Sequence, residues 1–167
     1  LAVDGSGIKV SNRGEWIRRK WKIRRGFLKI HIAVDVKRKK ILALEVTDEK
    51  VGDGRMLQPL VEEASKKSKI AKTIGDGAYD TKSNFRYLDD KGIEPVIKVR
   101  KNASSRAGGC MPRKLVAQEY LQDPSAWKRS HGYGQRWMAE TAISSYKRTF
   151  GEYVSAKTIR NMANELM

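Results

Sequence analysis

The sequence has one cysteine, two histidines and no apolar run near the twenty residues needed to cross a membrane. A single cysteine allows no internal disulfide and no cysteine-based zinc site, which is compatible with a reducing compartment. His31 and His131 have no carboxylate or cysteine neighbour at metal-ligand spacing, so we expect surface or half-buried side chains. Because no apolar span or signal peptide is recognisable, we expect a cytoplasmic protein with no membrane partner.

Acidic residues are scarce relative to basic ones. Lys and Arg number 35 against 19 Asp and Glu, which gives a formal net charge of +16 and an isoelectric point near 10.1. Each phosphate that a base neutralises releases condensed counterions, so this excess favours nucleic acid as the partner. Three tryptophans lie among bases, where packing against lysine stems is predicted and stacking on a splayed base is the alternative; they are Trp16, Trp21 and Trp127.

The spacing of apolar residues indicates an α/β chain. Three strands are predicted first, with a hairpin turn between the second and the third, over residues 1–10, 27–36 and 40–47. Helical and strand patterns then alternate, with Asp53 and Thr81 as candidate helix N-caps. This order predicts a mixed sheet, three antiparallel strands then parallel strands, flanked by helices.

The second half of the chain divides into a loop-like part and a helical part. Residues 100–130 are rich in glycine, serine and bases, and we predict a loop or a small insertion there. Helical spacing returns over residues 133–150, and a final short helix is predicted over 156–167. With 167 residues, 40% of them hydrophobic, the chain can bury one core, so we predict a single domain.

The stretch GYGQRWMAETAISSYKR, residues 132–148, places four functional side chains three, four and seven positions apart, namely Tyr133, Arg136, Glu140 and Lys147. At about 100° per residue these steps bring all four onto one face of a helix. The same pattern is typical of a solvated helix face with an Arg–Glu pair, which contributes about 0.3–0.5 kcal/mol. A solvated face and a functional face are therefore both compatible with this stretch.

Two further carboxylates lie beside glycines, which let an ion or a ligand approach the backbone. Asp4 lies in the first strand and Asp76 ends a later one. Carboxylates that the fold brings together repel one another unless they share a cation, so a cluster of Asp4, Asp76 and Glu140 would bind hard divalent ions such as Mg²⁺. Taken separately, Asp4 is equally a polar residue at a strand end, and Asp76 a turn former.

These residues resemble the catalytic domain of the DDE insertion-sequence transposases of bacteria and archaea. The resemblance is to the group defined by a Tyr, two residues, Arg, three residues, Glu, six residues, Lys signature, which the stretch above matches at every spacing. "VDGSGIKV" around Asp4 resembles the first-aspartate strand of that group. "GDGAYDT" around Asp76 resembles the second-aspartate box, with Tyr79 and Asp80 as supporting residues. "KVRKNAS" and "KRTFGEYVSA" extend the resemblance over nearly the whole chain.

The resemblance implies a ribonuclease H-like fold for one catalytic domain over residues 1–167, without the N-terminal end-binding region of the family. It implies that Asp4, Asp76 and Glu140 are the catalytic residues and hold two Mg²⁺ ions, with Mn²⁺ as a possible substitute. The implied DNA-binding residues are Tyr133, Arg136 and Lys147.

The implied reaction is metal-dependent strand cleavage and strand transfer in DNA transposition. Its partners would be double-stranded DNA at the transposon ends and the target, and the full-length transposase would be a dimer. We accordingly expect the protein at the nucleoid.

Two alternatives remain open on the sequence. Family members usually carry a long region before the first aspartate strand and continue beyond the last helix. The chain is therefore also compatible with a fragment, a frameshifted half or a decayed element, and a decayed element would be a non-catalytic, basic DNA-binding remnant. A ribonuclease H-like nuclease with other substrates would share the metal site, but the Tyr–Arg–Glu–Lys signature disfavours it.

Overall fold

The computed structural model describes residues 1–10, 27–100, 102–104, 108–156 and 158–167. At its centre is a mixed sheet with the strand order β3-β2-β1-β4-β5, and β6 pairs with β1. The strands are β1 (Ala2–Val10), β2 (Phe27–Asp35), β3 (Lys40–Asp48), β4 (Lys72–Gly75), β5 (Glu94–Ile97) and β6 (Tyr153–Val154). The first three strands pair antiparallel, and β4, β5 and β6 pair parallel. The predicted sheet is confirmed and is consistent with a ribonuclease H-like fold.

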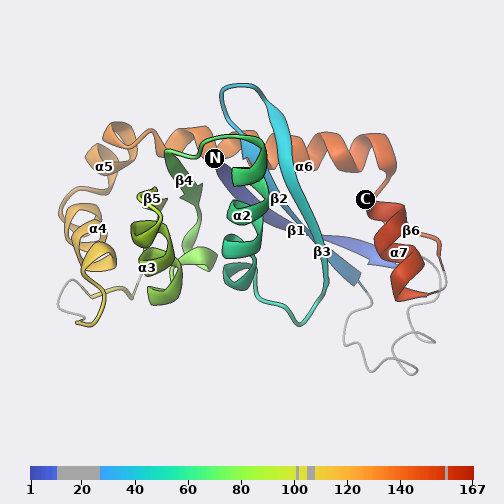
Figure 1. Ribbon diagram of the computed structural model, residues 1–167, viewed down its shortest axis with the longest axis horizontal. Coiled ribbons are helices and arrows are strands. Elements are labelled where there is room, and N and C mark those ends of the chain that lie inside the picture. The colour runs from blue at the N-terminus through green and yellow to red at the C-terminus, as the bar shows by residue number, and fades with distance from the viewer. Residues whose placement is uncertain (11–26, 101, 105–107, 157) are drawn as a thin grey trace.

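Helices cover both faces of the sheet (Figure 1). One face is covered by α2 (Leu57–Lys67) and α3 (Lys82–Asp90), and α6 (Trp137–Phe150) crosses the other. The remaining helices are α4 (Met111–Gln122), α5 (Pro124–Ser130) and α7 (Ile159–Leu166), and short 3-10 turns are η1 (Asp53–Met56), η2 (Gly77–Tyr79) and η3 (Tyr133–Arg136). None of the helices in the described ranges is long and apolar enough to cross a membrane.

The alternation of side chains along β1 decides which face each functional residue occupies. Ala2 packs in the cluster that includes Met138 and Ile143 of α6, whereas Val3 packs in the cluster that includes Leu57 and Leu60 of α2. Successive side chains of a strand point to opposite faces. Asp4 therefore lies on the α6 face, and Gly5 lies on the α2 face.

The loop prediction for residues 100–130 differs from the structure, which has α4 and α5 within that range. Pro112 lies in the first turn of α4, where a proline is tolerated. Asp123 caps α5, because its Oδ1 accepts hydrogen bonds from the main-chain N–H groups of Ser125 and Ala126, both at 2.9 Å. Both glycines of that range lie before residue 110, whereas two of its serines, Ser125 and Ser130, are accommodated in α5.

The helix cap predicted at Thr81 is confirmed, the cap predicted at Asp53 is wrong, and Trp127 lies in the core. Thr81 caps α3, with its Oγ1 accepting from the N–H of Asn84 at 3.2 Å, as predicted. Asp53 does not cap a helix and lies within η1. Trp127 is only 3% exposed and packs on Tyr133, with ring centroids 5.7 Å apart, so it is a core residue. Trp16 and Trp21 lie outside the described residues.

The helix predicted over residues 133–150 begins later than expected. Residues 133–136 form the 3-10 turn η3, and regular α-helix begins at Trp137. Tyr133 and Arg136 therefore lie in this turn, and Glu140 and Lys147 in α6. Tyr133, Arg136 and Glu140 still interact, and Lys147 lines a groove together with Glu140.

Candidate active site

Asp4 and Asp76 occupy equivalent points of two neighbouring parallel strands. Ala2 of β1 pairs with Ile74 of β4, so two further residues along each chain bring Asp4 beside Asp76. Each carboxylate is oriented by an amide of its own segment. Oδ1 of Asp4 accepts from the N–H of Gly5 at 2.9 Å, and Oδ1 of Asp76 accepts from the N–H of Ala78 at 2.8 Å.

Glu140 approaches Asp4 from the first turn of α6, and Arg136 joins the two. Nη1 of Arg136 lies 3.3 Å from Oδ2 of Asp4, and its Nη2 contacts Oε1 of Glu140. The four-residue step from Arg136 to Glu140 is the helical spacing that brings side chains into contact. One guanidinium therefore bridges two of the three predicted catalytic carboxylates.

Asp4 lies in the electrostatic field of Asp76 and Glu140. Burial raises the pKa of Asp4 above its ordinary value, Gly5 and Arg136 lower it, and the charges of Asp76 and Glu140 raise it further. The site thus accumulates negative charge, which a cation would stabilise.

Tyr133 lies in the same field. Burial raises its pKa to about 12, Arg136 opposes this shift, and Asp76 and Glu140 add to it. The Tyr133 hydroxyl is therefore protonated near neutral pH and can donate a hydrogen bond.

An open groove of about 640 Å³ follows α6 along the site; we call it the α6 groove. The residues that line it include Asp4, Ser6, Glu140, Ser144, Lys147 and Arg148. Lys147 lies seven residues after Glu140, on the same face of α6. Two basic side chains therefore share a groove with two of the predicted catalytic carboxylates.

The carboxylates of the site suit a divalent metal ion by their chemistry, but they are not arranged as a ready metal site. Within the described residues, no group of three His, Cys, Asp or Glu side chains forms a ready metal site. The guanidinium of Arg136 forms ion pairs with Asp4 and Glu140, so its positive charge already balances two of the carboxylates. The donor set is nonetheless made of carboxylate oxygens, the ligands that hard divalent ions prefer, and in this respect it fits Mg²⁺.

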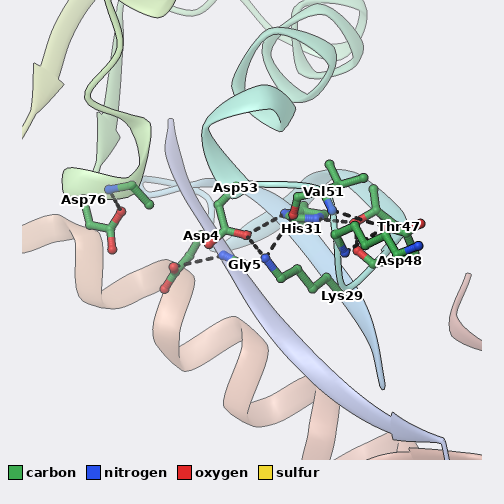
Figure 2. A network of polar contacts seen from close by, with 11 residues as sticks. Asp4, Gly5, Lys29, His31, Thr47, Asp48, Val51, Asp53 and Asp76 are labelled. Carbon is green, nitrogen blue, oxygen red and sulfur yellow. Dashed lines mark hydrogen bonds and ion pairs between the residues drawn. The ribbon is translucent and has the colours of Figure 1, made fainter. Parts of the chain in front are cut away.

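A second polar network, shown in Figure 2, lies on the α2 face of β1 and was not predicted. Nε2 of the fully buried His31 lies 2.8 Å from Oγ1 of Thr47. That hydroxyl also donates to the carbonyl of Asp48 at 3.2 Å. Among the described residues Nδ1 has no hydrogen-bond partner, and it lies 3.7 Å from Oδ1 of Asp53, which Lys29 Nζ approaches to 3.2 Å.

The expectation of surface or half-buried histidines is wrong for His31 and confirmed for His131. Burial lowers the pKa of His31, so it is neutral near pH 7, and it is fully buried rather than half-buried. The half-buried His131 has a carboxylate at each ring nitrogen, with Glu94 at 2.8 Å and Glu119 at 3.1 Å. The partners come from other elements, so spacing in the sequence carried no signal of them.

Gly5 joins the two networks, and we expect Gly5→Ala to disturb both. A Cβ at this position would lie 3.0 Å from Nδ1 of His31 and 3.2 Å from Oδ1 of Asp53, so the strand or those side chains must shift. The shift should destabilise the fold by about 1–3 kcal/mol and reorient the N–H that holds Asp4. Urea denaturation measures the loss. Gly52→Ala is the matched control, since its Cβ would meet nothing within 4 Å; an equal effect of both changes would contradict the prediction.

Tyr79 and Asp80, the two residues expected to support Asp76, are both buried. Nε and Nη2 of Arg113 bind the two oxygens of Asp80 at 2.6 and 2.9 Å, and the N–H of Arg100 donates to Oδ2 at 2.9 Å. Tyr79 packs over Gly75, and burial raises the pKa of its hydroxyl. Asp80 thus ties the turn after Asp76 to α4 and to the chain beyond β5.

The chain was compared with known proteins. A family model described as the transposase DDE domain matches residues 1–167. The matched range includes β1 with Asp4, the turn at Asp76 and α6 with Glu140. No solved structure matches the chain.

Proposed function

The chain belongs to the transposase DDE domain family, and from that premise we propose that it catalyses metal-dependent DNA strand cleavage and strand transfer. The proposed catalytic residues are Asp4, Asp76 and Glu140. The observation that carries this proposal is the placement of Asp4, which the register of β1 on β4 brings beside Asp76 and which shares the Arg136 guanidinium with Glu140. The alternative is a non-catalytic, basic DNA-binding remnant of a decayed transposase, and the presence of all three carboxylates and of the Tyr–Arg–Glu–Lys residues does not favour it.

The three carboxylates would hold two Mg²⁺ ions, or Mn²⁺ in their place, which supply charge stabilisation to the attacking and leaving oxygens of an in-line phosphoryl displacement. The protein contributes orientation. The Gly5 N–H fixes Oδ1 of Asp4, and the Ala78 N–H fixes Oδ1 of Asp76. These amides hold two half-buried carboxylates in a set orientation before any ligand arrives, which lowers the cost of ordering them.

The basic and aromatic residues of the signature would bind the DNA backbone near the reacting phosphate. Lys147 lies in the α6 groove with Glu140. Tyr133 keeps its proton near neutral pH, so its hydroxyl can donate to a phosphate oxygen. Arg136 can exchange its contacts with Asp4 and Glu140 for a bidentate contact with phosphate. The proposed substrates are double-stranded transposon ends and target DNA, bound by a dimer of the complete transposase.

Lys147→Ala tests the phosphate-binding part of this proposal. We expect weaker binding to duplex DNA and a salt dependence whose log–log slope falls in magnitude by about 0.9, since one phosphate contact is lost. Fluorescence anisotropy over a range of salt concentrations measures both. Lys66→Ala is the control, because it removes the same charge from an exposed pair with Glu63 on α2. Equal slopes for the two variants would remove Lys147 from the DNA interface, and failure of the parent protein to bind DNA at low salt would overturn the proposed function.

A further inference from the structure

A second open groove, of about 600 Å³, lies on the α2 face of the sheet, beside η1, η2 and the start of α3; we call it the η1 groove. Its polar lining includes Lys29, Asp53, Arg55, Gln58, Ser83 and Arg100. None of these residues belongs to the proposed catalytic set. The groove therefore needs an explanation of its own.

The η1 groove presents hydrogen-bond donors and an excess of positive charge. Three of its side chains are basic and one is acidic, and the acid, Asp53, already pairs with Lys29 at 3.2 Å. Arg55 and Arg100 are exposed. Nε of Arg100 is anchored on the carbonyl of Gly77 at 3.0 Å, which sets the direction of its guanidinium. The two guanidinium groups lie in one groove with the Gln58 amide and the Ser83 hydroxyl. Such groups suit a DNA backbone, because each phosphodiester is anionic and accepts hydrogen bonds.

The η1 groove adjoins the turn that carries Asp76. Ala78 lines this groove, and its N–H is the donor to Oδ1 of Asp76. Gly54 fixes η1 against the same turn, because a Cβ there would lie 2.7 Å from the carbonyl oxygen of Ala78. Asp76 and the η1 groove thus share one rigid turn.

The two grooves approach β1 from opposite faces. Asp4 lines the α6 groove, whereas Asp53 lines the η1 groove and lies near Gly5 on the α2 face (Figure 2). β4 ends at Gly75, and the described pairing of β1 on that side resumes with β6 at Lys9. Between Ala2 and Lys9, β1 has no strand partner on that side among the described residues, and this edge of β1 lies beside Asp4.

We propose that the η1 groove binds the DNA backbone on one side of the reacting phosphate, while the α6 groove binds it on the other side. This inference rests on the proposed function, because it extends the DNA path beyond the Tyr–Arg–Glu–Lys residues. In this path the DNA strand passes Asp4 and Asp76 along the unpaired edge of β1. Arg55 and Arg100 hold one flank, and Lys147 and Arg148 hold the other.

The experiment compares Arg55→Ala with Lys147→Ala on three duplexes, one with both flanks of the cleavage position and two with one flank removed. Arg55 is the residue of choice because it is exposed in η1, so its loss should leave the melting temperature unchanged. Lys66→Ala again controls for net charge. We expect Arg55→Ala to weaken binding about tenfold on duplexes that keep one particular flank, and Lys147→Ala to do so for the opposite flank. On the complete duplex the two losses should add.

Three other outcomes of this experiment would contradict, respectively, the η1 groove as a DNA site, the two-sided DNA path and the proposed function. If Arg55→Ala and the double variant Arg55→Ala/Arg100→Ala bind every duplex as Lys66→Ala does, while Lys147→Ala is impaired, the η1 groove is not a DNA site and the proposed function stands. If Arg55→Ala and Lys147→Ala are impaired on the same flank, the two-sided path is wrong. If the parent protein binds none of the duplexes, the proposed function fails, and this inference fails with it.

Discussion

Glu140→Gln is expected to abolish DNA strand cleavage while leaving DNA affinity equal to or slightly above that of the parent protein. The change keeps the size of the side chain and removes one carboxylate from the proposed metal-binding set. Losing one charge-stabilising group of an active site costs about 10²–10³ in rate, and losing a metal ligand should cost at least that. Affinity should not fall, because the lost charge is negative and faces the α6 groove.

The measurements are cleavage of a labelled transposon-end duplex in Mg²⁺ or Mn²⁺, Mn²⁺ binding by calorimetry, and DNA binding by anisotropy. Glu152→Gln is the matched control, since Glu152 lines the same groove and carries the same charge. It should retain cleavage and Mn²⁺ binding. Cleavage by Glu140→Gln at the parent rate would show that Glu140 is not a catalytic residue.

Arg113→Met is expected to give the largest loss of stability among these changes, about 3–5 kcal/mol. Asp80 has no exposed side-chain surface, and Arg113 binds both of its oxygens. Among the described residues, removing Arg113 leaves this buried carboxylate with the N–H of Arg100 as its remaining partner. A loss of this size is a large fraction of the 5–15 kcal/mol that holds a typical domain folded, and we expect the turn after Asp76 to loosen first.

Urea denaturation gives the free energy of unfolding of Arg113→Met, which is compared with that of two further variants, Arg113→Lys and Lys66→Met. Arg113→Lys keeps the charge but loses the paired contact, so its loss should be intermediate. Lys66→Met breaks an exposed ion pair with Glu63 and should cost less than about 1 kcal/mol. If Arg113→Met were as mild as Lys66→Met, Asp80 would not be an anchor of the Asp76 turn.

The sequence by itself determined the features that depend on local spacing. Alternation of apolar residues predicts the strands β2 and β3, and the order of strands and helices predicts the mixed sheet. The half-buried character expected of β2 is wrong, because this central strand is buried on both faces. The side chain of Thr81 caps the helix directly after it. This role could be predicted because the partner, the N–H of Asn84, is only three residues away in the sequence. The family was likewise readable, because its signature is a set of spacings within residues 133–147.

Only the tertiary structure decided which side chains meet. Arg136 contacts Asp4 across 132 positions of the sequence, and Lys29 contacts Asp53 across 24. The periods of strands and helices set the face on which a side chain lies, but the path of the chain and the register of β1 against β4 set what faces it. Asp53 therefore resembled a helix cap in the sequence, since a cap is a local contact, whereas in the fold it pairs with Lys29 of β2 because η1 folds against that strand.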